Sequence, residues 1–278
     1  MARMTKILNA LLFFSCAASL ANEVFSENWS GKLYDENSQM QFNAALPLVA
    51  QFSFNDDDNV LDIGCGNGKI TRVIAEKVSK GSVIGIDRAP EMIAFACEKY
   101  RDKENLEFLQ CDACDLPFEN QFNCAVSFSC LHWVKDLEKA VSKIARSLKS
   151  GGKLLILMEL KNEYPLVKAL SEVLTEHRLE IPWYFYTMQE LQNWLTQEHF
   201  ESIEFADYFQ EFTFKNKAEL KAWVESFPYG SELDAHEQMA MNNEIVERYL
   251  LYASSCENDL IRVVFPETII TATKCEFS

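Results

Sequence analysis

Apolar and polar positions follow two different periods along the chain, and these periods predict its elements. From Asn59 onward, short apolar runs alternate with stretches whose apolar residues recur every three or four positions. The short runs predict strands at about 59–64, 82–87, 106–112, 122–131 and 153–160. The periodic stretches predict helices at about 69–79, 90–100 and 137–149, the last ended by Gly151 and Gly152. Apolar strands joined by amphipathic helices indicate a parallel sheet with right-handed crossovers.

The pattern changes after Lys161. Helical spacing is predicted at about 165–179, 188–200, 218–227 and 232–255, with strands at 202–214 and 259–274. The sequence contains no internal repeat and no glycine–serine linker. We therefore expect one domain with helices inserted late, and not two independent domains.

The first 25 residues differ from the rest. Arg3 and Lys6 precede an apolar stretch from Ile7 to about Leu20, and small residues follow near position 21. This three-part pattern is typical of a secretory signal, and the stretch is shorter than the ~20 apolar residues of a membrane span. A start-site artefact or an amphipathic leader is the alternative. We expect a leader at 1–25 and a folded domain at 26–278.

Charge narrows the range of partners. The net charge is −16, from 26 basic and 42 acidic residues. Such a chain repels phosphate backbones and anionic membrane surfaces, so we expect no nucleic-acid partner.

Nine cysteines are present, and Cys111 with Cys114 forms a C-x-x-C pair that has no second pair to complete a zinc site. Reduced, mostly buried thiols favour the cytoplasm, whereas the leader favours export. Both locations stay open at this stage.

Three glycines, Gly64, Gly66 and Gly68, lie between the first predicted strand and the first helix. An ordinary turn is one interpretation, but ligands of open parallel sheets bind at the carboxyl ends of strands. A dinucleotide fingerprint would place the third glycine one residue later. Asp62 precedes the loop, and a carboxylate repels phosphates but attracts an ammonium group. The loop therefore suits a ligand with an amino-acid end.

Two further acids stand at the ends of the next two predicted strands. Asp87 can accept hydrogen bonds from ribose hydroxyls, and Asp112 can accept from an exocyclic amine such as that of adenine. The alternative is that both are solvated strand-end acids. Amino acid, ribose and adenine in this order describe S-adenosylmethionine (SAM).

The stretches "VLDIGCGNGKIT", "VIGIDRAPEM", "FLQCDACDLPF", "CAVSFSCLHWV" and "LKSGGKLLIL" resemble the class I SAM-dependent methyltransferases over about residues 38–160. The resemblance implies an α/β fold with a doubly wound, mostly parallel seven-stranded sheet. Residues 161–275 would supply the last strands and a late helical insertion that acts as a substrate lid. "SCLHWVKD" and "YDENSQMQ" are similar to the branch of the trans-aconitate, malonyl-carrier-protein and juvenile hormone acid methyltransferases.

The resemblance also implies site residues. The methionine end of SAM would be held by Asp62, Gly64 and Gly66, the ribose by Asp87, the adenine by Asp112 and Ala113, and Ser129 would lie beside the sulfonium. Cys65 and Arg88 belong to the same cofactor-binding segments. No metal is expected, because the cofactor itself carries the activated methyl group.

The acceptor is inferred from the segment after the fourth strand. It reads "SFSCLHWV" in place of the Asn/Asp-Pro-Pro-aromatic signature of enzymes that methylate amino groups of nucleic acids. In carboxyl-methylating relatives an aromatic residue here and a glutamine in the N-terminal helix orient the substrate. Trp133 and Gln41 match these, Gln41 by its spacing from Tyr34.

The role of His132 depends on the acceptor. A carboxylate is already ionised and needs no base, whereas a hydroxyl or carbon acid would need one, and His132 is the first candidate. The structural alternatives are a core role for Trp133, a packing role for His132 and a surface position for Gln41.

The aromatic-rich segments 181–188 and 223–230 would cover the acceptor, unless they are only a helix-packing face. Aromatic side chains suit an apolar acid; a small polyacid would instead need cations, for which Arg178, Arg248 and Arg262 are candidates. We expect a small-molecule acceptor, most simply a carboxylic acid. C- or N-methylation of a metabolite is one alternative, and a non-catalytic SAM-binding or exported interaction protein is another.

Overall fold

The computed structural model describes residues 31, 35, 38–161, 164–179, 183–225, 233–253, 256–257 and 260–275. The expected leader at 1–25 lies outside these residues, as do Tyr34 and parts of both aromatic-rich segments (181–182 and 226–230). Within the described residues, no helix has the length and apolar character needed to cross a membrane.

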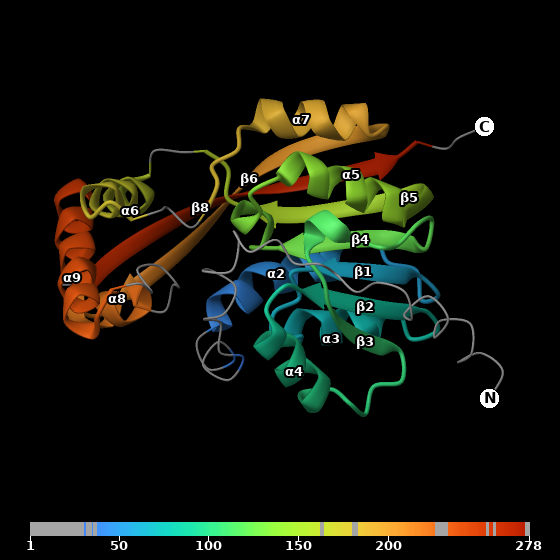
Figure 1. Ribbon diagram of the computed structural model, residues 1–278, viewed down its shortest axis with the longest axis horizontal. Helices are drawn as coiled ribbons and strands as arrows, with labels where there is room; N and C mark the ends of the chain where they lie inside the picture. The colour runs from blue at the N-terminus through green and yellow to red at the C-terminus, as the bar shows by residue number, and fades with distance from the viewer. Residues whose placement is uncertain are drawn as a thin grey trace.

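One twisted sheet forms the centre of the molecule, and its strand order is β3-β2-β1-β4-β5-β8-β6. Five parallel strands follow the predicted apolar runs: β1 (Asn59–Ile63), β2 (Ser82–Asp87), β3 (Leu106–Gln110), β4 (Phe122–Phe128) and β5 (Leu148–Met158). The long β8 (Leu260–Lys274) inserts antiparallel between β5 and β6 (Phe200–Phe214), and the short β7 (Cys256–Glu257) pairs with β8. The predicted seven-stranded, mostly parallel sheet is confirmed (Figure 1).

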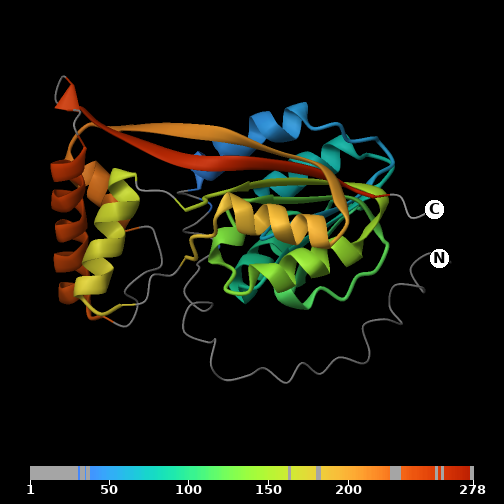
Figure 2. The same ribbon diagram turned by 90° about the horizontal axis from the view of Figure 1, so that it is seen from above.

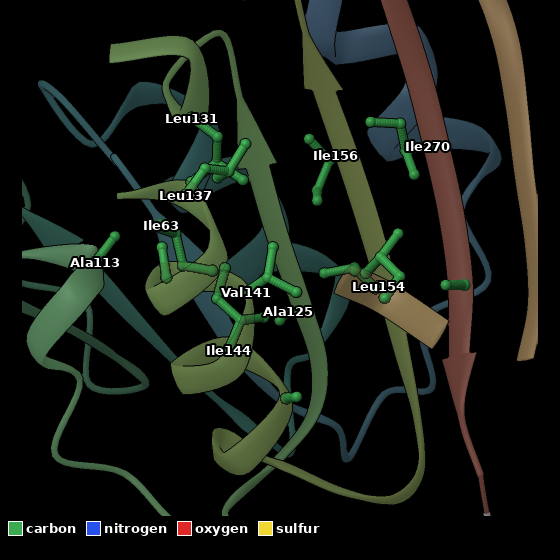
Figure 3. Close-up of a cluster of buried hydrophobic side chains, with 14 of the residues drawn as sticks. Ile63, Ala113, Ala125, Leu131, Leu137, Val141, Ile144, Leu154, Ile156 and Ile270 are labelled. Carbon is green, nitrogen blue, oxygen red and sulfur yellow. The ribbon is translucent and has the colours of Figure 1, made fainter. Parts of the chain in front are cut away.

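Helices cover both faces of this sheet, which is what a doubly wound fold requires. One face carries α2 (Gln39–Gln51), α3 (Lys69–Lys77) and α4 (Pro90–Lys99), and the other carries α5 (Leu137–Ser147) and α7 (Met188–Gln197) (Figure 2). Val141 and Ile144 of α5 lie beside Ala125 of β4, and they share one buried cluster with Ile156 of β5 and Ile270 of β8 (Figure 3). The antiparallel strand β8 therefore shares one core with the parallel strands.

The predicted boundary between the third helix and the fifth strand is wrong. The helix expected at 137–149 ends at Ser147, and Leu148 already pairs with Phe122 as the first residue of β5. Gly151 and Gly152 consequently lie inside β5, where the register with β4 shifts and Gly151 has φ +73°. The two glycines mark a bend in a strand and do not end the helix.

The late helices form a second layer of packing. Pairing of β5 with β8 stops at Met158 and Thr268, but β6 and β8 stay paired as far as Phe214 and Ile261. Around this extension lie α6 (Pro165–Glu176), α8 (Lys217–Val224) and α9 (Ala235–Tyr252), whose apolar faces form a cluster of their own (Figure 1). We call α6, α8, α9 and the extended strand ends the helical extension. It lies beyond the carboxyl end of β5, the end at which parallel sheets bind ligands.

Candidate active site

The glycine loop needs glycine for two physical reasons. Gly64, Gly66 and Gly68 all have positive φ, at +73°, +53° and +76°. A Cβ on Gly64 would lie 2.1 Å from the Cys130 sulfur, which no real contact allows. The loop is therefore pressed against the segment that follows β4, and its left-handed backbone is available to glycine at no steric cost.

Asp87 joins this loop to the end of β2. Its Oδ2 accepts a hydrogen bond from the Gly66 N–H at 2.9 Å, and its Oδ1 accepts from the Ala89 N–H at 2.9 Å. Each carboxylate oxygen keeps a second lone pair, so Asp87 can still accept from ribose hydroxyls. Burial raises the pKa of Asp87, although both backbone hydrogen bonds act to lower it.

Asp112 follows β3 and accepts from the Cys114 N–H at 2.8 Å. Arg88 lies 3.8 Å from it, so the two predicted cofactor residues form a half-exposed ion pair. Ala113 is buried beside them and offers an apolar surface. The structure thus brings Asp62, Asp87 and Asp112 to adjacent carboxyl ends of β1, β2 and β3.

Asp62 is the most buried of these acids, with 2% of its surface exposed. Burial raises its pKa to about 7, while the hydrogen bond that Thr71 Oγ1 donates to Oδ2 at 2.7 Å opposes that rise and the charge of Asp87 adds to it. A buried carboxylate near a second acid is costly without a cation. An amino-acid ligand would bring that cation as its ammonium group, so the residues fit SAM.

The side chain of Cys65 is buried among Ala96 and Phe108. Burial raises the pKa of its thiol well above the usual range. Its contribution to the loop is the backbone N–H, which donates to Ile86 O at 2.9 Å.

Ser129 follows β4 with φ +50°, and its Oγ donates a hydrogen bond to Oε1 of Glu267 at 2.7 Å. The hydroxyl expected beside the sulfonium is therefore engaged with β8. Sequence reasoning did not identify Glu267; the one available signal was an acid inside the apolar run 261–273.

His132 and Trp133 lie on a short 3₁₀ turn, η2 (Leu131–Trp133). His132 is 5% exposed, and its Nδ1 accepts a hydrogen bond from the Glu159 N–H at 3.2 Å. Burial lowers its pKa to about 3. A neutral imidazole whose Nδ1 is an acceptor carries its proton on Nε2, so this histidine is a hydrogen-bond donor at its other nitrogen.

Trp133 connects this turn to the helical extension. Its ring centroid lies 5.7 Å from that of His132 and 5.4 Å from that of Trp183, and Trp133 packs against the cluster of the helical extension. Trp133, which the sequence analysis expected near the methyl-transfer point, therefore also contacts the helical extension, the expected substrate lid.

Gln41 lies on α2, and its Oε1 is a buried atom without a hydrogen-bond partner among the described residues. One turn later, the Ala44 carbonyl accepts from Tyr208 Oη at 3.2 Å, which ties this part of α2 to β6. A buried amide oxygen normally has a partner, so a ligand or water is expected to complete it.

The described residues contain no group of three or more His, Cys, Asp and Glu side chains placed to hold a metal ion. Seven of the described cysteines are free thiols, and Cys111 and Cys114 are among them. Their thiols donate to the Asp112 and Asp136 carbonyls, each at 3.4 Å.

Comparison with known proteins agrees with this geometry. A methyltransferase-domain family model matches residues 61–156. A putative methyltransferase of Invertebrate iridescent virus 6 is 28% identical over 236 residues, which cover 82% of this chain and 87% of that protein. The malonyl-[acyl-carrier protein] O-methyltransferase of Priestia megaterium is 29% identical over 131 residues, 46% of this chain and 47% of the relative. The juvenile hormone acid O-methyltransferase of Drosophila melanogaster is 25% identical over 181 residues, 60% of this chain and 59% of the relative. The match thus spans most of the viral protein but only about half of each of the other two.

Solved structures share the fold. The YcgJ protein of Bacillus subtilis superposes with a TM-score of 0.62 at 20% identity, covering 85% of this chain and 100% of that one. A phosphoethanolamine N-methyltransferase of Haemonchus contortus, solved with S-adenosyl-L-methionine, superposes with a TM-score of 0.57 at 21% identity, covering 87% and 53%. With the sheet order, the glycine loop and the three strand-end acids, the methyltransferase-domain match and the relatives named as methyltransferases identify the chain as a SAM-dependent methyltransferase with the class I fold.

Proposed function

We propose that this methyltransferase methylates a carboxylate oxygen of a small, largely apolar acid. The observation that carries the proposal is the hydrogen bond from the Glu159 N–H to Nδ1 of His132. It makes His132 a donor at Nε2, and its low pKa keeps the ring neutral. A donor can hold an ionised acceptor, whereas a hydroxyl or carbon acid would need a base at this position.

The residues around His132 fit a positioning role. When SAM is bound, its sulfonium supplies an already activated methyl group. The protein then has to orient the acceptor and exclude water. Trp133 offers a flat apolar wall against the helical extension, and the Gln41 amide offers a further polar contact.

The arginines of the helical extension argue for an apolar acid and against a polyacid. Arg248 donates to Glu176 at 2.6 Å and to Glu244 at 2.8 Å, and Arg262 pairs with Glu211 across β6 and β8. Two of the three cations considered for a polyacid are therefore neutralised within the protein, and the third, Arg178, is exposed just after the end of α6. The names of two relatives, O-methyltransferases of a malonyl carrier protein and of juvenile hormone acid, support a carboxylate acceptor.

An amine acceptor is the second candidate, because Glu267 is a buried carboxylate at the junction with the helical extension. A buried anion favours a cationic ligand. N-methylation of a small amine would use that charge, and His132 would then have no anion to bind.

A methyl-transfer screen separates these functions. The full chain is incubated with methyl-labelled SAM and matched sets of acids, amines and phenols, and each product is treated with mild base. A methyl ester releases its label as methanol, whereas N- and C-methyl products keep it. Asp87→Ala, which removes the acceptor of the Gly66 N–H, serves as the control that should lose cofactor binding. Turnover of amines with base-stable label, and none of acids, would contradict the proposal.

A further inference from the structure

Glu267 lies where the parallel sheet meets the helical extension. Thr268, the residue after it, is the first residue of β8 along the chain that pairs with β5. Phe265 and Val263, which precede Glu267 on the same face of β8, belong to the cluster of the helical extension. Glu267 is 3% exposed. A glutamate at the centre of an otherwise apolar strand is costly to bury, so a specific interaction has to offset that cost.

Both carboxylate oxygens of Glu267 accept hydrogen bonds. Ser129 Oγ donates to Oε1 at 2.7 Å, and the Gln210 side-chain amide donates to Oε2. Burial raises the pKa of Glu267, and these two hydrogen bonds act in the opposite direction. Two donors on two oxygens are the arrangement that holds an ionised carboxylate. Among the described residues no Lys, Arg or His forms an ion pair with it.

This anion is linked to the cofactor loop by a short chain of contacts. Ser129 precedes Cys130, whose sulfur packs so closely on Gly64 that a Cβ there would lie 2.1 Å away. Glu267 is therefore one hydrogen bond from the segment that rests on the glycine loop. Glu159 follows Met158, the last residue of β5 that pairs with β8, and it is also buried, at 1% exposure. Two buried acids thus flank the end of β5 and β8.

We propose that Glu267, held by Ser129 and Gln210, is the anionic partner of the donor's sulfonium and makes the site prefer SAM over S-adenosylhomocysteine. Methyl transfer converts the cationic sulfonium into a neutral thioether. The attraction to Glu267 is then lost, which favours departure of the product. The inference rests on the identity of the cofactor, and it assigns the charge of Glu267 to the sulfonium and not to a cationic acceptor.

The test compares the affinities of the two cofactor forms, measured by calorimetry on the full chain without an acceptor. Glu267→Gln keeps the shape, because its amide can accept from Gln210 and donate to Ser129. A unit charge that acts over about 10 Å at an effective dielectric constant of roughly 20 changes an affinity on the order of 10-fold, and we expect Glu267→Gln to weaken SAM binding by that factor. Binding of S-adenosylhomocysteine should stay within about 3-fold, since a neutral thioether does not feel the charge.

Two variants complete the test. Glu211→Gln removes an exposed charge from the neighbouring strand, where Glu211 pairs with Arg262, and should leave the ratio of the two affinities unchanged. Glu267→Asp retains the charge and should retain most of the preference for SAM. An equal loss of both affinities in Glu267→Gln would show that Glu267 has a purely structural role. No change in either affinity would show that the Glu267 charge does not act on the bound cofactor. Each of these results would overturn the inference. If the wild-type chain bound no SAM at all, the assignment of the cofactor itself would be overturned.

Discussion

The Glu159 backbone N–H and the His132 imidazole form a hydrogen bond of 3.2 Å that fixes which ring nitrogen carries the proton. Nδ1 is the acceptor, so the proton resides on Nε2. A histidine in this state can orient an anion but cannot remove a proton through Nε2. This hydrogen bond therefore favours a carboxylate acceptor over acceptors that have to be deprotonated by a base.

The first prediction follows from that tautomer. His132→Ala should keep kcat within ~10-fold, whereas loss of a general base costs ~10²–10⁴-fold. Because burial lowers the His132 pKa to about 3, the ring is neutral throughout the neutral pH range and the kcat profile should show no step that belongs to it. Steady-state kinetics from about pH 5 to about pH 8 checks both points. A rise in rate through pH 6–7 that disappears in His132→Ala would contradict the carboxylate proposal.

Trp133 should matter more than His132. Its ring lies 5.4 Å from the Trp183 ring and 5.7 Å from the His132 ring, so it joins the transfer point to the helical extension. Trp133→Ala should lower kcat by ~10²-fold, the effect of a misplaced acceptor.

The matched control for this change is Trp194→Ala. Trp194 lies on α7 and its ring packs on that of Tyr186. Both residues contact the core cluster that contains α5, and not the cluster of the helical extension. Replacement of Trp194 should lower the melting temperature and leave kcat nearly unchanged at a temperature where the variant is folded. Equal kinetic effects of the two substitutions would mean that Trp133 is only a core residue.

The sequence predicted the parts of the site that depend on local order. Asp62, Asp87 and Asp112 each stand at or near the end of a short apolar run, and the carboxyl ends of parallel strands meet at one edge of the sheet. Glu267 could not be predicted in this way. Its partner Ser129 is 138 residues away, and they meet only because β8 inserts between β5 and β6. Likewise, Leu148 could extend a helix by its periodicity, but strand pairing with Phe122 decides its conformation.

Asp62 predicts how stability depends on pH. Burial raises its pKa from the usual 3.8 to about 7 in the folded chain, so the folded state binds its proton more tightly than the unfolded state. The stability that proton binding at Asp62 contributes is fully present below the unfolded-state pKa, and it is lost as pH rises through the folded-state pKa. Asp62→Asn removes this dependence. The variant should therefore gain stability relative to the wild type between about pH 5 and about pH 8, by on the order of a few kcal/mol.

Thermal unfolding in the absence of ligand measures this gain at each pH. The wild-type curve should keep part of its slope in the variant, because burial also raises the pKa values of Asp87 and Glu267. Saturating SAM should reduce the gain, since the ligand's ammonium stabilises the ionised carboxylate that the asparagine lacks. A difference in stability that is constant across pH would show that Asp62 does not titrate in this range.

The last prediction separates the two reasons for glycine at position 64. Gly64→Ala introduces both a contact of 2.1 Å with the Cys130 sulfur and a side chain at φ +73°. Strain from the left-handed conformation alone costs ~1–2 kcal/mol, and the clash should add to it, so the single variant should lose SAM binding and several degrees of melting temperature. Cys130→Ala leaves the contact site empty and should destabilise the chain modestly, by about 1–2 kcal/mol for a small buried group. In the double variant the clash is removed and the strain remains, so a double-mutant cycle should give a favourable coupling between positions 64 and 130 of at least ~1 kcal/mol. Strictly additive effects would mean that the loop shifts away from Cys130 without cost, and that backbone conformation alone requires glycine there.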